Sequence, residues 1–277
     1  MRIDLHTHST ASDGTLTPGE LVTAAAAAGL DVIAVTDHDT TAGWEAALAA
    51  APPGLSVVLG AELSCRWSGV EPAISLHLLA YLFDPHAAPL ASELARLRHA
   101  RLHRAERIVE RLRADGIDVT WSEVLGYANG GTVGRPHLAQ ALIRRGLVAN
   151  TAEAFRPEWL GERYRLPKEE LDVFVALRLV RAAGGVAVFA HPRATRRGRI
   201  VPDELIASLA AEGLFGLEAD HPDHSPAERA HVRALAADLG LAVTGSSDFH
   251  GTHKTTRLAE FTTDPEVYER LLATARA

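Results

Sequence analysis

Short apolar runs of β-forming residues alternate with helical segments over most of this chain of 277 residues. We expect strands at Arg2–His6, Val32–Thr36, Ser56–Glu62, Ala73–Phe83, Val186–Ala190, Phe215–Ala219 and Ala242–Ser246. Several of these runs are almost continuously apolar, which is typical of parallel strands that are buried on both faces. The alternation predicts an α/β fold and favours a parallel barrel over an open sheet, although strand spacing alone leaves both possible.

Cap and turn residues mark the ends of the expected helices. Thr17 is a suitable N-cap with Glu20 three residues later as its capping-box partner, and Gly29 follows where that helix would end. Ser225 precedes a proline in the same way, and Gly240 lies at the expected end of that helix. The sequence therefore predicts well-bounded helices between the strands.

One segment departs from this alternation. From residue 93 to residue 165 the sequence is helical and rich in arginine, with no convincing strand. We interpret it as a helical insertion subdomain on the loop after the fourth strand, which would contribute to substrate binding. Residues 1–92 and 166–277 would then form the catalytic barrel.

Composition narrows the classes of function. A net charge of −7 argues against binding of duplex nucleic acid, and no apolar run approaches the roughly 18 residues of a membrane span. The chain has one cysteine, Cys65, and no sign of a signal peptide, so we expect a cytoplasmic protein without disulfides. No feature of the sequence indicates an oligomeric state.

Residues of the types that bind metals follow the expected strands, at the point where each strand ends. Residues two apart in an extended segment face the same side, so His6 and His8 can reach one ion together. The motifs are Asp4-x-His6-x-His8, Thr36-Asp37-His38, Gly60-Ala61-Glu62, Ala190-His191-Pro192 and Ser247-Asp248-x-His250. Any one of them could be a capped strand end or a surface histidine. Their accumulation on the rim where parallel barrels place active sites predicts a metal centre of histidines and carboxylates.

This set of motifs, together with His77, resembles the PHP (polymerase and histidinol phosphatase) family over the whole chain. The resemblance implies a distorted seven-stranded β/α (TIM-like) barrel that hydrolyses phosphate esters. It also implies two or three divalent metal ions at the C-terminal ends of the strands. Manganese is expected first, with zinc, iron or magnesium as alternatives.

The resemblance also assigns ligands to each ion. A first ion would be held by His6, His8, Glu62 and Asp248. Glu62 would bridge to a second ion, completed by His77 and His191, and a third ion would be held by Asp13, His38 and His250. Glu62, Asp248 and His191 are expected to be catalytic, whereas Asp4 and Asp37 would orient the histidines. Two assignments stay open, because the loop Ser9–Gly14 permits another register for Asp13 and because His77 could be a core histidine inside an apolar strand.

A second group of residues lies in the insertion. Arg101 falls on the apolar stripe of a helix with Arg104 beside it, and Arg135 and His137 lie near the positive N-terminus of another helix. These arginines could instead reach solvent or pair with carboxylates such as Glu106. The insertion and its Gly-Arg-Pro-His element resemble the branch of nucleoside 3′,5′-bisphosphate phosphatases and short-RNA 5′ exonucleases. That resemblance implies that these four residues grip a phosphate that is not cleaved.

Three functions are compatible with these features. The leading one is hydrolysis of the 3′-phosphate of a nucleoside 3′,5′-bisphosphate, or of a short oligonucleotide with a 5′-phosphate. The alternatives are a phosphatase of histidinol phosphate or another small monoester, and a non-catalytic PHP domain. We interpret the remaining histidines as a possible pocket wall at His221 and His224, and as surface residues at His86, His99, His103, His231 and His253.

Overall fold

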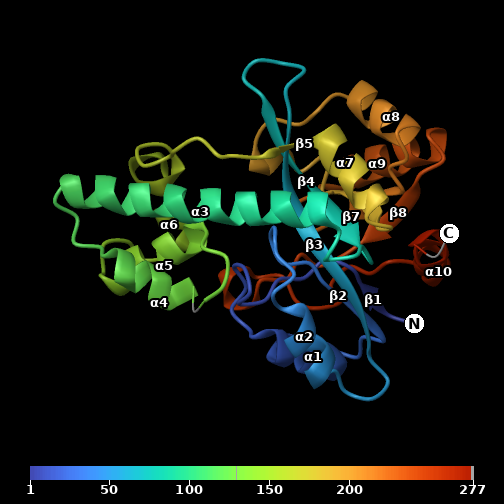
Figure 1. The fold of residues 1–277 in the computed structure, drawn as a ribbon, viewed down its shortest axis with the longest axis horizontal. Coiled ribbons are helices and arrows are strands. Elements are labelled where there is room, and N and C mark those ends of the chain that lie inside the picture. Colours follow the sequence, from blue (N-terminus) through green and yellow to red (C-terminus); the bar gives the residue numbers. More distant parts are fainter. Residues whose placement is uncertain (129, 276–277) are drawn as a thin grey trace.

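Seven strands follow one another around a barrel-shaped sheet in the computed structural model, which describes residues 1–128 and 130–275 (Figure 1). The strand order is β1 (Ile3–Asp4), β2 (Val32–Val35), β3 (Ser56–Trp67), β4 (Ile74–Tyr81), β6 (Val186–Ala190), β7 (Gly216–Asp220) and β8 (Ala242–Gly245). A further short strand, β5 (Leu171–Asp172), pairs with β3. A parallel bridge between Thr7 and Phe249 joins the two ends of the sheet, so the predicted seven-stranded barrel is nearly closed.

Helices connect most of these strands, and their caps agree with the sequence. They are α1 (Pro18–Ala27), α2 (Trp44–Ala50), α3 (Ala88–Ala114), α4 (Trp121–Ala128), α5 (Arg135–Arg144), α6 (Thr151–Ala154), α7 (Val173–Ala182), α8 (Asp203–Ala211), α9 (Pro226–Asp238) and α10 (Pro265–Ala275). Single helical turns lie at Pro157–Gly161, Thr195–Arg197 and Gly251–His253. The expected capping box forms at Thr17, and the helix expected after Ser225 also begins with one, between Ser225 and Glu228. Within the described part of the chain, no helix combines the length and the apolar character needed to cross a membrane.

The strands are not all parallel, which corrects the expectation from their apolar runs. β4 is antiparallel to both of its neighbours, β3 and β6. β3 continues five residues past the expected end at Glu62, so only six residues separate it from β4. A parallel crossover needs a dozen residues or more, and the chain can therefore only turn back on itself.

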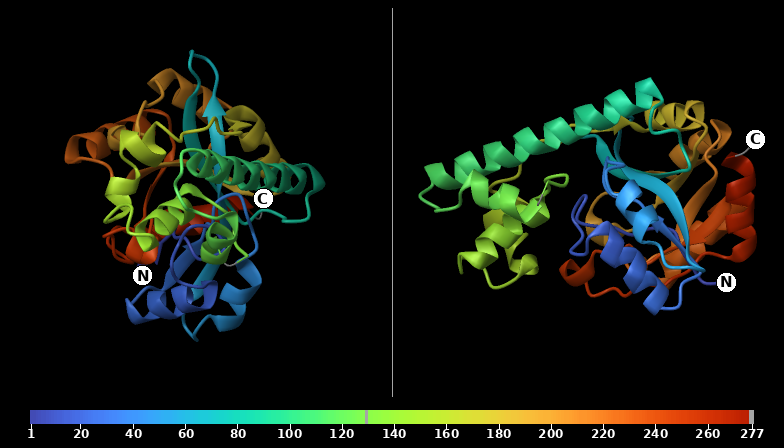
Figure 2. Two further views of the ribbon diagram at one scale, coloured as in Figure 1. Left: turned by 90° about the vertical axis from the view of Figure 1, so that its left-hand side faces the viewer. Right: turned by 60° about the horizontal axis from the view of Figure 1, so that its bottom comes forward.

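Helix α3 contributes to two of the hydrophobic cores of the described residues. Its first half packs Leu94 and Leu97 against the core of the barrel, whereas its second half packs Ile108 and Leu112 into a separate core. That second core is drawn from residues between 105 and 166, of which all but Leu166 fall in the predicted insertion. Figure 2 shows α3 as one straight helix that runs from the barrel to the helices α4, α5 and α6.

The insertion contacts the barrel close to the C-terminal ends of the first strands. The amide of Thr132 donates to the carbonyl oxygen of Ala11, and Gly131 packs so closely that a Cβ atom there would lie 2.1 Å from the carbonyl oxygen of Thr10. Only glycine permits this approach of the two backbones. The insertion is thus held over the rim on which the predicted ligands gather.

The two cores predict two regions of separate stability. Leu138→Ala removes a fully buried side chain from the second core, which we expect to cost about 2–5 kcal/mol. Hydrogen exchange should then speed up between residues 105 and 166 and change little in β6, β7 and β8. Leu63→Ala, in the barrel core, is the matched control and should have the reverse pattern. Equal acceleration of both regions by Leu138→Ala would show that the chain unfolds as one unit.

Candidate metal centre

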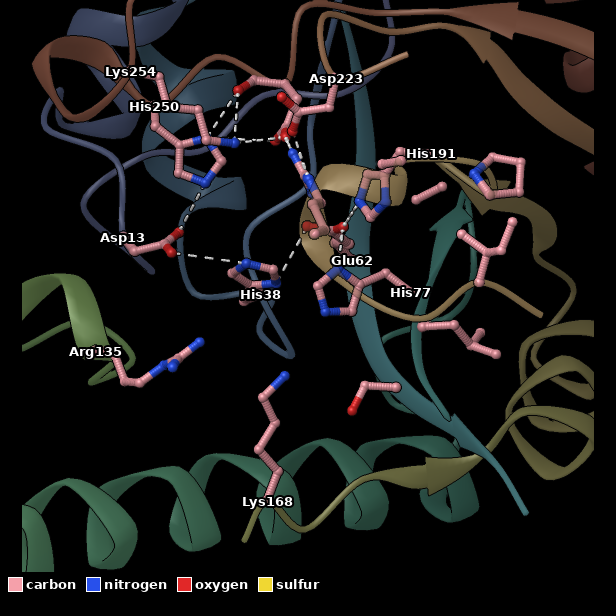
Figure 3. Close-up of a pocket in the computed structure, with 18 of the residues that line it drawn as sticks. Asp13, His38, Glu62, His77, Arg135, Lys168, His191, Asp223, His250 and Lys254 are labelled. Atoms are coloured by element: carbon pink, nitrogen blue, oxygen red, sulfur yellow. Dashed lines mark hydrogen bonds and ion pairs between the residues drawn. The ribbon is translucent and has the colours of Figure 1, made fainter. Parts of the chain in front are cut away.

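The carboxylate of Glu62 lies at the centre of the rim, surrounded by imidazoles from several strands (Figure 3). Its Oε1 atom is 2.7 Å from Nδ1 of His77 and 3.0 Å from Nε2 of His191. Its Oε2 atom lies within 3.2 Å of ring nitrogens of His6, His8 and His38. The two oxygens therefore face different histidines, which is the arrangement that a carboxylate bridging two ions requires.

His77 reaches this group because β4 is antiparallel. It pairs with Ser64 on one side and with Ala190 on the other, so it lies level with His191 although it is in the middle of its strand. Its side chain is 19% exposed and points at Glu62. The structure thus places His77 on the rim and not in the hydrophobic core.

Two more groups of donors flank Glu62. His6 and His8 both present Nε2 to Oδ1 of Asp248, at 3.4 Å in each case. Asp13 presents its two oxygens to His250 and His38, at 3.4 and 3.7 Å. All nine predicted ligands are therefore brought together, in sets whose donor atoms lie within 4.8 Å of one another or in direct contact with Glu62.

The donor atoms fit divalent ions better than they fit one another. The Nε2 atoms of His6 and His8 face each other at 3.1 Å, and at most one of two such nitrogens can donate a hydrogen bond to the other. Among the described residues, the buried Nδ1 atoms of His38 and His77 have no hydrogen-bond partner although a carboxylate oxygen is near each. Buried polar atoms are normally paired, and nitrogen and carboxylate donors suit zinc, manganese and iron. The residues present could therefore hold such ions.

Backbone strain concentrates at the same rim. Asp39, His191 and Asp248 follow strands β2, β6 and β8 and have φ values of 54°, 34° and 49°. Positive φ is uncommon for residues other than glycine, and such strain persists only where the surroundings impose it. At His191 and Asp248 it turns the side chain toward the metal-ligand set, whereas at Asp39 it turns the carboxylate toward Ser64 and Arg101.

The buried charges shift one another's pKa values. Burial lowers the pKa of His8, but hydrogen bonds to Asp248 and Glu62 outweigh burial and raise it to about 9. The pKa of His6 is likewise raised, because the charges of Glu62 and Glu218 outweigh burial. For His250, burial and the nearby Lys254 and His8 lower the pKa to about 4. The rim therefore holds both protonated and neutral imidazoles near pH 7.

Carboxylates behind the rim hold the histidines, in part as predicted. Asp37 accepts from the hydroxyl of Ser12, whose oxygen lies 3.4 Å from Nδ1 of His8, so it acts on that ring through the serine. Asp4 accepts from the backbone amides of His6, Ser247 and Ala259, and among the described residues it has no hydrogen bond or ion pair with a histidine ring, so it acts on the backbone of His6.

Glu218 takes the role expected of Asp4, and the sequence analysis did not identify it. Its Oε1 lies 3.0 Å from Nδ1 of His6, and its Oε2 accepts from the backbone amide of His191. A carboxylate inside the apolar run Phe215–Ala219 was the signal that could have found it. His221, which is fully buried, lies 3.2 Å from Oδ2 of Asp248. Nδ1 of His253 donates to the carbonyl oxygen of Asp13 at 2.9 Å, so this histidine is not the free surface residue that was expected.

A cavity of about 520 Å³ opens from the ligands toward the insertion. Two cations line it near the ligands, Arg197 and Lys254, and both contact Oδ2 of Asp248. Arg135 and Lys168 line its other end and point toward His38 and His77 across the open space (Figure 3). Apolar side chains form the wall between the two ends, from Ile74, Leu76, Phe155, Ile200 and Val201.

The four predicted phosphate-binding residues differ in their surroundings. Arg101 is bound to Asp39, with 2.7 Å between Nε and Oδ2, and its NH2 group donates to Ser64. His137 is buried and accepts from the amide of Gly134 at the start of α5. Neither of these two residues lines the cavity, whereas Arg135 does.

The cations of this group repel one another. Burial, together with the charges of Arg101 and Arg135, lowers the pKa of Arg104 to about 10. Burial also lowers the pKa of Lys168, with Arg101 and Arg135 adding to the effect. A bound anion would relieve this repulsion, so the group is suited to a phosphate.

Comparison with known proteins gives related chains of similar length. The chain is 35% identical over 253 residues to a 5′-3′ exoribonuclease of Haemophilus influenzae, which covers 90% of each chain. It is 35% identical over 252 residues to a 3′,5′-nucleoside bisphosphate phosphatase of Chromobacterium violaceum, covering 90% of this chain and 87% of that protein. A crystal structure described as a metal-dependent phosphoesterase of Bifidobacterium adolescentis superposes with a TM-score of 0.92, at 37% identity over 98% of this chain and 96% of that one.

The model of the PHP domain matches residues 4–119, a segment that carries six of the nine predicted ligands. The other three ligands, His191, Asp248 and His250, lie within the range that the longer similarities span and join the same rim in the structure. The barrel, its donor-lined rim and these relatives agree, and the chain belongs to the PHP domain family.

Proposed function

We propose that this protein is a metal-dependent phosphoesterase that acts on substrates with two phosphate groups. These would be nucleoside 3′,5′-bisphosphates, from which it removes the 3′-phosphate, or short oligonucleotides with a 5′-phosphate. The names of the Haemophilus and Chromobacterium relatives support this proposal, since they describe an exoribonuclease and a nucleoside bisphosphate phosphatase.

One observation carries the proposal: a single cavity joins the metal-ligand set to a separate group of cations. Arg135 of the insertion and Lys168, just after the insertion, face the ligands across the cavity, and Arg104, whose charge acts on Lys168, has no hydrogen bond or ion pair among the described residues. Lys168 lies 3.3 Å from Oε1 of Glu170, but Arg135 and Arg104 have no acidic partner among the described residues, and a substrate with one phosphate at the ligands would leave them so. A second phosphate would pair with them, and this accounts for the excess positive charge.

The residues of the rim have distinct tasks in this reaction. Divalent ions bound there would neutralise the phosphoryl oxygens, lower the pKa of a bound water and stabilise the leaving oxygen. Glu62 would hold two ions at a fixed separation, and Glu218 would keep His6 in the orientation that presents Nε2 to the first ion. We expect manganese first, with zinc, iron or magnesium as alternatives, and a reducing cytoplasm in keeping with the free, buried thiol of Cys65.

The wall between the two ends would take the nucleoside. Ile74, Leu76 and Val201 are nearly buried and Ile200 is 40% exposed, which leaves an apolar surface beside the charged groups. Sugar and base carbons can pack there without a hydrogen bond to a particular base edge. We therefore infer a preference for nucleotides with little choice between bases.

The alternative of a small monoester, such as histidinol phosphate, is less well supported. Such a substrate would use the ligands but would have no group to pair with Arg135 and Lys168. The third possibility, a non-catalytic domain, conflicts with the gathering of the nine donors into one group, seven of which line a single cavity.

Metal binding near pH 7 should release protons. A pKa of about 9 keeps His8 protonated at that pH, and the raised pKa of His6 does the same, whereas an imidazole binds metal only when neutral. Titration calorimetry with Mn²⁺ in two buffers of different ionisation enthalpy measures this release, which should decrease as the pH rises past 9. Equal heats in the two buffers at pH 7 would contradict it.

Glu62→Gln should impair every substrate. The side chain keeps its size but loses the charge that both groups of histidines face, so the protein should bind fewer ions and lose activity on bisphosphate and monoester alike. Elemental analysis and phosphate release measure the two effects. Glu45→Gln, an exposed carboxylate on α2, is the control and should match the wild type. Normal metal content and activity in Glu62→Gln would rule out the bridging role.

Arg135→Ala and Lys168→Ala should separate the two classes of substrate. Each charge-assisted contact contributes ~1.5–3 kcal/mol, or about one to two decades in kcat/KM for adenosine 3′,5′-bisphosphate. Slow hydrolysis of p-nitrophenyl phosphate should hardly change, because that ester does not reach the cations. Arg144→Ala is the matched control, since this exposed arginine lies on the same helix α5.

Arg101→Ala is a less direct test because it also leaves the buried Asp39 without its ion pair. The activity of Arg101→Ala must therefore be compared with its free energy of unfolding. Equal losses on both substrates for Arg135→Ala and Lys168→Ala would remove the main support for a two-phosphate substrate and favour the small monoester.

A further inference from the structure

A second pair of histidines, far from the rim in sequence, repeats the facing geometry of His6 and His8. His99 and His103 lie four residues apart on the exposed side of α3, one turn above the other. Their Nε2 atoms are 2.7 Å apart, and their ring planes meet at 82°. The corresponding nitrogens of His6 and His8 are 3.1 Å apart.

The spacing of the nitrogens identifies the kind of ion that suits them. With metal–nitrogen bonds of ~2.0–2.1 Å, two ligands at a right angle lie ~2.9 Å apart, whereas two tetrahedral ligands lie ~3.3 Å apart. The pair on α3 is close to the right-angled case. Neighbouring ligands meet at right angles in square-planar and octahedral coordination. With nitrogen donors in proteins, these geometries are typical of Cu²⁺ and Ni²⁺.

A carboxylate stands behind one of the rings. Oε2 of Glu106 lies 3.6 Å from Nδ1 of His103, on the side opposite to the Nε2 atom that faces His99. Histidine ligands commonly have a carboxylate at the second ring nitrogen, which fixes the ring and makes the first nitrogen a better donor. At 3.6 Å this contact is an ion pair and not a hydrogen bond, so Glu106 favours a cation at His103 through its charge.

The position of the pair on α3 gives it a structural consequence. Between Leu97 in the barrel core and Ala105 in the second core, no residue of the helix is buried. The inner side of this span carries Arg101, whereas His99 and His103 occupy the outer side. A link between residues four apart stabilises the turn that joins them.

We propose that His99 and His103 chelate one Cu²⁺ or Ni²⁺ ion through their Nε2 atoms and so brace the middle of α3. The site is independent of the catalytic rim and of the substrate proposed above. Water would fill the remaining coordination positions, because no other donor of the described residues lies against both nitrogens.

Binding of Cu²⁺ to the untagged full chain, first loaded with Mn²⁺, tests the site. Equilibrium dialysis with elemental analysis of both metals should show one fewer Cu²⁺ per chain in His99→Ala and in His103→Ala than in the wild type, at unchanged Mn²⁺ content. Both changes place alanine in an exposed helix, where it favours folding. His86→Ala removes a lone exposed histidine just before α3 and is the matched control, which should bind as much Cu²⁺ as the wild type. Equal Cu²⁺ content in wild type, His99→Ala and His103→Ala would overturn the site.

Hydrogen exchange tests whether the bound ion stabilises the middle of α3. Cu²⁺ should slow the exchange of amides between residues 97 and 107 in the wild type and in His86→Ala, and should have no such effect in His99→Ala. If Cu²⁺ binds to the wild type but leaves exchange in that span unchanged, the ion does not brace α3 and that part of the proposal fails.

Discussion

The compensation of charge around the buried carboxylate of Glu62 governs the catalytic end of this barrel. A lone carboxylate in so enclosed a place would be protonated, yet the facing histidines hold the pKa of Glu62 well below its ordinary value against the opposing effect of burial. Histidines likewise lower the pKa of Asp13 against burial, and for Asp248 Lys254 acts together with His6 and His250. No member of the set can be lost without leaving a buried charge uncompensated. The positive φ values at the strand ends and the reversed strand β4 both serve to bring these groups into contact.

Most of this centre could be predicted from the sequence because its donors follow strands, and strand ends are marked by local pattern. The run Val186–Ala190 became β6 with the same bounds, and His191 follows it directly. The direction of β4 was not predicted. Because β3 was expected to end at Glu62, the connection to β4 looked longer than the six residues that the structure shows. Glu218 was missed for a related reason: a single charged residue inside an apolar run is unremarkable until the opposite wall of the barrel is known to carry His6.

The insertion shows a different limit of sequence reasoning. The apolar stripe of α3 and the helix start at Arg135 are local features, and both were predicted. The partner of Arg101 is not local, because Asp39 lies 62 residues away and is turned toward it by a positive φ. That ion pair, together with the contact of Thr132 with Ala11, joins the insertion to the barrel. Arg101 therefore has a task in the fold whether or not it also meets a phosphate.

The straight course of α3 has a consequence for how a nucleic acid chain would be used. A continuous helix anchored in two cores keeps the cations of the insertion at a set distance from the metal ligands, since bending it would break backbone hydrogen bonds. If those cations hold a terminal phosphate, the scissile bond is chosen by its distance from that end and not by the identity of the base. The helix would then set the length of the fragment that is removed. Each cleavage would expose a new terminus, so degradation would proceed by units of constant length.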